Sequence, residues 1–167
     1  MNYIDSYDSP VGPITLAGNG THITGLWFDG QKYDRSSLKT DLYEVKSLPV
    51  FDLTKKWLDI YFSGSPPSFT PPLLLSGSAF RQCIAQIMLE IPFGHTTSYG
   101  QIAKIAATRT QKLQISAQAV SGAVSHNPIS IIIPCHRVIG SSGNLTGYAA
   151  GLDIKRFLLN HEHIALR

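Results

Sequence analysis

A cysteine and a histidine stand side by side, Cys135 and His136, in the stretch IIIPCHRVIG. A cysteine is a good nucleophile when its thiolate is favoured, and a nearby histidine held by a third group can favour it. Neighbouring residues of an extended strand point to opposite faces, so the two side chains can share a site only if the chain turns there. Pro134 lacks a backbone donor and favours such a turn. The stretch predicts either a reactive thiol or a structural Pro-Cys corner.

A histidine that acts as a base needs a partner that fixes its tautomer. Beyond residue 75 the chain has only three carboxylates, Glu90, Asp153 and Glu162. Glu162 ends the segment LDIKRFLLNHE, which we interpret as a helix and therefore as a rigid support. From residue chemistry alone, a Cys135–His136–Glu162 site and a structural corner both stay open.

Several elements must position this stretch. Residues 130–133 (SIII) read as a short buried strand, because β-branched residues favour strands. A helix is predicted from the Ser78 N-cap through SAFRQCIAQIMLE, with Cys83 on its apolar side as a core thiol. Two further short helices, in TSYGQIAKIAA and after Ser116 in SAQAVSGAVS, suggest a helix-turn-helix.

The second of these short helices is made almost entirely of small, uncharged residues. A reader of base edges in the major groove would carry Arg, Asn or Gln at several exposed positions. Small residues instead permit close approach, either to a partner surface such as a shallow groove or to other helices of a core. The composition leaves both interpretations open.

The first part of the chain is predicted to be rich in strands. Residues 1–30 contain three β-rich runs, with Asn19-Gly20 as a hairpin turn between the second and the third. Residues 31–47 are expected to be a loop with some helix, and FDLTKKWLDIYF a helix. The Pro/Ser-rich segment 64–72 is the candidate boundary. We therefore expect two domains, 1–72 and 73–167.

Composition narrows the class of protein. The chain has 167 residues with 43% hydrophobic and 15% charged residues, as in ordinary globular proteins. No apolar run approaches the length of a membrane span, so a cytosolic protein without membrane partners is expected. The two cysteines are expected to be reduced. Residues 76–167 carry eight Lys/Arg against three Asp/Glu, a balance that can attract nucleic acid.

The segment NPISIIIPCHRVIGSSGNLTGYAAG, followed by LLNHE, resembles the O6-alkylguanine-DNA alkyltransferase family, also called methylated-DNA–protein-cysteine methyltransferases. The match is close from about Phe80 to Glu162, and the Pro-Cys-His-Arg-Val block is specific to that family. The resemblance favours the reactive thiol. It implies an α+β protein: an N-terminal α/β domain with a small antiparallel sheet, then a mainly helical, winged-helix DNA-binding domain.

The resemblance also implies roles for individual residues. Cys135 would be the alkyl acceptor, and His136 the base that activates it through a bound water. Glu162 would orient the histidine, Asn127 would brace the network, and Tyr99 would assist the departure of guanine.

The same resemblance implies a base pocket and a DNA-binding helix. The carbonyl of Val138 would lie near the base edge, and Tyr148 and Ala149 would belong to the loop that walls the pocket. The second short helix would enter the minor groove, with small residues suited to this approach. Its expected DNA-binding residues are Gln118, Ala119, Ser121 and Gly122.

Two features depart from the family pattern. Gln118 stands where the family normally has an arginine that fills the space of a flipped base. The segment between Tyr99 and that position is also about five residues longer than usual, with the extra length near residues 108–114.

The implied function is repair of double-stranded DNA that contains O6-alkylguanine, and also O4-alkylthymine, after the nucleotide is flipped out. Each monomer, located in the cytoplasm with the nucleoid, would accept one alkyl group without metal or organic cofactor. Two other classes remain as alternatives: a non-catalytic alkyltransferase-like protein that binds lesions, and a Cys-His hydrolase. A metal site at His161 and His163 is disfavoured, because alternate residues of a helix do not share a face.

Overall fold

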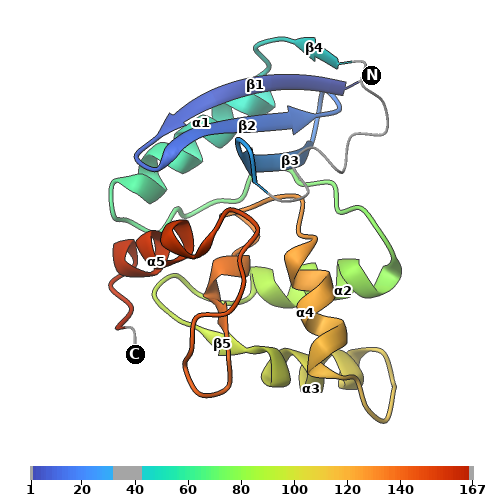
Figure 1. Ribbon diagram of the computed structural model, residues 1–167. Coiled ribbons are helices and arrows are strands. Elements are labelled where there is room, and N and C mark those ends of the chain that lie inside the picture. Colours follow the sequence, from blue (N-terminus) through green and yellow to red (C-terminus); the bar gives the residue numbers. More distant parts are fainter. Residues whose placement is uncertain (1, 32–42, 166–167) are drawn as a thin grey trace. The chain divides into compact units, whose positions relative to one another are not determined.

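A computed structural model describes residues 2–31 and 43–165 of the chain (Figure 1). It divides into two compact units. The first comprises Met1–Leu75 and Pro128–Ser130, and the second comprises Ser76–Asn127 and Ile131–Arg167. The α+β class predicted from the sequence is confirmed, with a small sheet in the first unit and mainly helices in the second.

The first unit is built on a four-stranded sheet in the order β3-β2-β1-β4. Strands β1 (Asn2–Ser9), β2 (Gly12–Gly18) and β3 (Ile23–Phe28) pair antiparallel as the sequence predicts, whereas β4 (Tyr43–Val45) pairs parallel to β1. Most of the loop predicted over 31–47 lies outside the described residues.

Helix α1 (Pro49–Phe62) packs against β1 and β2 of this sheet (Figure 1). The helix predicted in FDLTKKWLDIYF is thus confirmed. Its inward side chains meet the buried residues of the strands, and together they form the core of the unit. The largest fully buried side chains of this core are Ile14, Leu16, Ile23, Leu26, Trp27, Phe51, Leu58 and Tyr61.

The second unit carries four helices among its described residues: α2 (Ala79–Leu89), α3 (Tyr99–Arg109), α4 (Ala117–Ser125) and α5 (Leu152–His161). The first three begin at serine N-caps whose hydroxyls accept backbone N–H groups, which satisfies donors that a helix start leaves open. Helices α2, α3 and α4 pack on one another. Strands β5 (Thr97–Ser98) and β6 (Val138–Ile139) form a short parallel pair.

The prediction of a strand over residues 130–133 is wrong. Ile131 has a left-handed φ of 68°, and the segment forms turns, although Ile131 and Ile133 are fully buried. The carbonyl of Ile133 accepts hydrogen bonds from the Cys135 backbone and the Asn127 side chain, and not from a neighbouring strand. Burial, which β-branched residues also satisfy, accounts for the composition of the segment.

Two further observations bear on the predictions. Cys83 is only partly buried, so the prediction of a core thiol is too strong for it. Within residues 2–31 and 43–165, no helix combines the length and the apolar character needed to cross a membrane.

Candidate active site

Cys135 begins a single turn of 3-10 helix, Cys135–Arg137, directly after Pro134. The turn predicted at the proline is therefore present. The backbone N–H of Cys135 donates to the carbonyl of Ile133 at 2.8 Å, which tightens the chain at this point. The cysteine is 6% exposed and the following His136 is fully buried. Because the chain turns here, the side chains of Cys135 and His136 are both buried although the two residues are adjacent.

Glu162, at the C-terminal end of α5, is hydrogen-bonded to His136, with Nε2 and Oε2 2.5 Å apart. Its other oxygen, Oε1, accepts from Arg137 Nε at 2.8 Å and from the backbone N–H of Gly94 at 3.0 Å. Arg137 also donates to the carbonyl of Ile91 at 2.7 Å. A buried carboxylate thus joins the turn, the end of α5 and the loop before β5.

The other two candidate carboxylates lie elsewhere. Glu90 forms an exposed ion pair with Arg109, with an N–O distance of 2.7 Å, and Asp153 is fully exposed with Arg156 at 3.8 Å. Of the three carboxylates named from the sequence, only Glu162 contacts the histidine.

Burial and the local charges set the protonation states of this group. Burial alone would raise the pKa of Glu162, but His136 and Arg137 together outweigh it and lower that pKa to about 2. Burial lowers the pKa of His136 below its usual value, and the charges of Arg137 and Lys155 act in the same direction, while Glu162 opposes them. At neutral pH the arrangement is therefore an ionised carboxylate beside a neutral imidazole, whose Nε2–H donates to Glu162.

The Cys135 thiol has opposing influences. Burial raises its pKa, whereas hydrogen bonds from Asn127 and Tyr148 and the charge of Lys155 lower it. Asn127 is buried just beyond α4, and its Nδ2 donates to the carbonyl of Ile133 at 2.9 Å. Its amide thus holds the backbone that precedes the cysteine. A thiol in such a position needs a base or a cation before it can react.

The residues predicted to form the base pocket lie on three segments. Tyr99 begins α3, and its hydroxyl is 2.8 Å from the hydroxyl of Thr146. Val138 is buried in β6, and its carbonyl accepts from Lys155 Nζ at 2.7 Å. Tyr148 and Ala149 are half-buried in the loop before α5.

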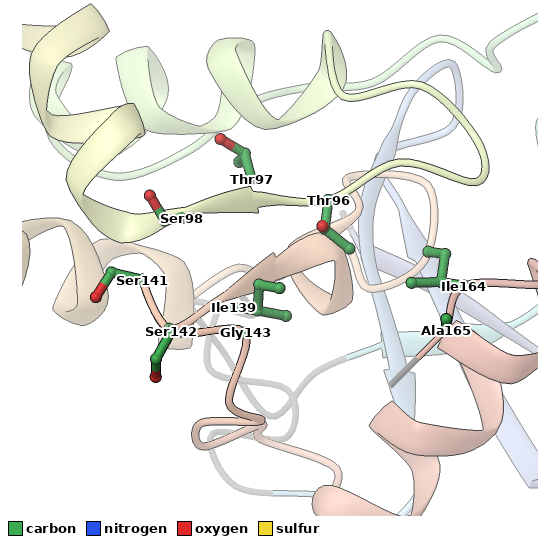
Figure 2. Close-up of a pocket in the computed structure, with 10 residues that line it drawn as sticks. Thr96, Thr97, Ser98, Ile139, Ser141, Ser142, Gly143, Ile164 and Ala165 are labelled. Carbon is green, nitrogen blue, oxygen red and sulfur yellow. The ribbon is translucent and has the colours of Figure 1, made fainter. Parts of the chain in front are cut away.

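A separate hollow of about 370 Å³ lies beside β5 and β6, lined by Thr96, Thr97, Ser98, Ile139, Gly140, Ser141, Ser142, Gly143, Ile164 and Ala165 (Figure 2). None of the predicted catalytic residues lines it. Figure 2 shows hydroxyl side chains from the strand β5 and from the loop after β6 around this hollow. Because Cys135 is not among its lining residues, the hollow is not the position of the thiol.

The four residues predicted to bind DNA form the exposed side of α4. Gln118, Ala119, Ser121 and Gly122 are all exposed, while Val120, Ala123 and Val124 are buried. A Cβ added at Gly122 would meet no atom within 4 Å. Packing in the core therefore does not account for the small residues on this side of the helix.

Residue reasoning from the sequence missed Arg137, Thr146 and Lys155. Arg137 is 8% exposed and Lys155 is fully buried, and both reach the site through the contacts given above. The signal for Lys155 is its spacing: it precedes Leu158, Leu159 and Glu162 by three, four and seven residues, which places all of them on one helix face.

Comparison with known sequences covers both units. Residues 79–164 match the family described as 6-O-methylguanine DNA methyltransferase, DNA binding domain, and residues 2–75 match its ribonuclease-like domain. A methylated-DNA–protein-cysteine methyltransferase from Methanosarcina barkeri is 44% identical over 167 residues, which cover 99% of each chain. One from Haemophilus influenzae is 39% identical, covering 97% of this chain and 87% of the relative.

Solved structures give the same picture. An OGT of Mycobacterium tuberculosis in complex with DNA has a TM-score of 0.83 and 39% identity, covering 96% of this chain and 92% of that one. An O6-methylguanine methyltransferase from the same organism has a TM-score of 0.82 and 41% identity, covering 97% and 93% of the two chains. Both the sequence and the fold are therefore similar over nearly the whole length.

Proposed function

The chain belongs to the family of 6-O-methylguanine DNA methyltransferases, and on that premise we propose that it repairs DNA by moving an alkyl group from O6 of guanine to Cys135. The observation that carries the proposal is the buried turn that sets Cys135 beside His136, with His136 held by Glu162 at 2.5 Å. O4-alkylthymine in DNA is the second proposed substrate. The product is a thioether, which gives water no carbonyl to attack, so each molecule reacts once.

In the proposed reaction the Cys135 thiol loses its proton, through a water molecule, to Nδ1 of the neutral His136. Glu162 accepts from Nε2–H and stabilises the imidazolium that results. The sulfur then forms a bond to the alkyl carbon while the carbon–O6 bond breaks, and its electron pair goes to guanine. Tyr99 supports the leaving guanine by a hydrogen bond. The departing guanine anion takes up one proton from solvent, and His136 releases the proton that it took from Cys135 to solvent, so the protons and the charges balance.

The proposed substrate is double-stranded DNA, from which the damaged nucleotide is flipped into the pocket. A buried thiol cannot reach O6 of a stacked base in line, so extrusion of the nucleotide is required. The exposed, small-residue side of α4 suits close approach to the minor groove, with Gln118 at the position that would fill the vacated space. The loop that carries the half-buried Tyr148 and Ala149 is the proposed wall of the base pocket, and the Val138 carbonyl is proposed to lie near the base edge.

Incubation with duplex DNA that contains O6-methylguanine tests the proposal directly. Peptide mass spectrometry should find one methyl group on the peptide that contains Cys135 and none on the peptide that contains Cys83. The comparison is informative because Cys83 is the more exposed of the two thiols, so unspecific alkylation would mark it first. DNA of the same sequence with unmodified guanine is the matched substrate control.

Two other outcomes of this experiment would favour a different function. An unmodified Cys135 together with tight lesion binding would favour the non-catalytic lesion-binding protein. Repeated cleavage of an ester or amide, with more than one turnover per molecule, would favour a Cys-His hydrolase.

A further inference from the structure

Lys155 is a fully buried lysine in the middle of α5. Lysines are rarely buried completely unless a partner compensates the charge. Its Nζ donates to the Val138 carbonyl at 2.7 Å and to the Thr146 carbonyl at 3.2 Å. The ammonium therefore connects β6 with the loop that leads to Tyr148, two of the segments assigned to the base pocket.

The carboxylate of this region is already used by other groups. Glu162 accepts from His136, Arg137 and the Gly94 backbone. Among residues 2–31 and 43–165, no carboxylate lies within ion-pair distance of Lys155. Two carbonyl dipoles offset only part of the cost of a buried charge. A negative partner for Lys155 must come from another kind of group.

The Cys135 thiolate is the candidate for that group, because Lys155 is bonded to the carbonyl of Val138, which directly follows the turn Cys135–Arg137. Burial lowers the pKa of Lys155 to about 8, and the charge of Cys135 acts against this decrease. In the other direction, the charge of Lys155 lowers the pKa of Cys135 against the effect of burial. The two influences are the two sides of one interaction, as linkage requires. When Cys135 is a thiolate and Glu162 is paired with Arg137, each buried charge has an opposite charge near it.

We propose that Lys155 is a positioning residue of the transfer reaction: its ammonium provides the counter-charge of the Cys135 thiolate and holds the Val138 and Thr146 carbonyls at the base pocket. The part of this proposal that concerns the transfer rests on the proposed function. The pairing with the thiolate is a property of the protein alone and can be measured without DNA. Lys155 keeps its protons throughout, and the proton released by Cys135 goes to His136.

The first test compares Lys155→Met with Arg156→Met. Each variant removes one cation from α5, but Lys155 is buried and Arg156 is exposed. The rate at which iodoacetamide modifies Cys135 is measured against pH, with the modified peptide quantified by mass spectrometry. In Lys155→Met the midpoint of the pH profile should rise by about one pH unit, which is a tenfold slower modification below the midpoint. In Arg156→Met it should stay at the wild-type pH.

An unchanged midpoint in a folded Lys155→Met protein overturns the proposal, because a lysine that only packs would alter stability and not the titration of the thiol. Lys155→Arg keeps the charge and should recover part of the change in midpoint, although its planar group fits the two carbonyls less well.

A second measurement covers the case in which Lys155→Met does not fold. The Lys155 ammonium is titrated by NMR in protein with 15N-labelled lysine, in wild type and in Cys135→Ser. Without the thiolate the pKa of Lys155 should fall further, and an equal pKa in the two proteins overturns the proposal.

The two proposals fail in different experiments. If methyl transfer from O6-methylguanine is absent but the pH midpoint depends on Lys155, then the pairing stands and the proposed substrate is wrong. If transfer occurs and neither the midpoint nor the Lys155 titration responds, then the proposed function stands and the role of Lys155 is wrong.

Discussion

Glu162 accepts hydrogen bonds from both His136 and Arg137, and only Arg137 is always charged. This difference explains why His136 is neutral. Arg137 carries a permanent positive charge and lies 2.8 Å from one carboxylate oxygen, so the charge of Glu162 is compensated without a protonated imidazole. His136 can then stay neutral, which its buried position also favours. A carboxylate bonded to a neutral imidazole makes it a stronger base, because the carboxylate stabilises the imidazolium that forms when the imidazole takes a proton. His136 is thus held in the unprotonated state that the proposed general base requires before reaction.

Glu162→Gln should slow alkyl transfer by about tenfold to a hundredfold while leaving DNA affinity unchanged. The amide lacks the charge that stabilises the imidazolium, and Glu162 is 3% exposed, so it is not available to phosphate. Single-turnover transfer rates and binding to lesion DNA are the two measurements. Asp153→Asn removes an exposed carboxylate from the same helix and should change neither. A loss of affinity with an unchanged rate at saturation would assign Glu162 to DNA binding instead.

Gln118→Arg should raise the rate of repair in duplex DNA and leave the reaction with free O6-alkylguanine base nearly unchanged. Glutamine is neutral and shorter, whereas arginine can stack in the vacated base position and attract phosphate. Flipping costs a few kcal/mol of unstacking, and this cost is absent for the free base. Gln118→Lys is the matched control, because it adds the charge without the planar group. Equal rates for Gln118→Arg and wild type on both substrates would show that another residue occupies the space.

At the scale of elements, the helices were predictable because local signals agree with packing. Ser78, Ser98 and Ser116 each cap a helix, and apolar residues follow at helical spacing. The turn at 130–133 was not predictable in this way. Its isoleucines would be equally suited to a buried strand or to a buried turn, and nothing local marks the left-handed φ of Ile131. Tertiary hydrogen bonds to the Ile133 carbonyl decide the backbone there.

The residues of the candidate site also differ in how well the sequence predicts them. Cys135, His136 and Glu162 could be named from residue type and from the family resemblance, and the contact between the last two is present. Lys155 escaped because lysine is normally a surface residue, although its spacing to Leu158 places it on the apolar side of α5. Residue type and position give opposite predictions for this lysine, and such a conflict is typical of functional positions.

Gly122→Ala should have opposite effects on the stability of the protein and on the proposed binding of DNA by α4. Alanine is favoured over glycine in a helix interior by about 1 kcal/mol, and the added Cβ meets no atom within 4 Å. Unfolding in urea should therefore show a more stable protein. If this side of α4 approaches the minor groove, the same methyl group should weaken DNA binding, and Gly122→Gln should weaken it further. Gln86→Ala, on the exposed side of α2, is the control that should leave DNA affinity unchanged. Undiminished affinity in both Gly122 variants would remove α4 from the DNA interface.

At the scale of the whole molecule, the described site lies entirely in the second unit. Residues 76–167, which contain the whole of this unit, have eight Lys/Arg against three Asp/Glu, while residues 1–75 have six against eight. Two of the eight cations, Arg137 and Lys155, are buried in the site, and one, Arg109, is paired with Glu90. Under the proposed function, the basic half of the chain divides its positive charge between the site of the thiol and the attraction of a polyanion.

The stability of the molecule should fall in two steps as the solution is acidified. The pKa of His136 is lowered in the folded protein, so the unfolded chain binds a proton more readily, and stability decreases as pH falls below about 6.5. Glu162 acts in a lower window. Its pKa is about 2 in the folded protein against 4.5 ordinarily, so its contribution is complete above pH 4.5 and disappears as pH falls toward 2. The difference corresponds to on the order of 3 kcal/mol.

Urea unfolding at a series of pH values measures both steps. Glu162→Gln should be less stable at neutral pH but should lack the decrease between pH 4.5 and 2 that this carboxylate causes. His136→Asn should lack the decrease that begins near pH 6.5. If the two variants reproduce the wild-type pH dependence, merely displaced to lower stability, then other groups govern acid unfolding and the buried pair does not titrate as a neutral imidazole beside an ionised carboxylate. That result would also remove the basis for His136 as a base that is ready at neutral pH, because the same protonation states underlie both arguments.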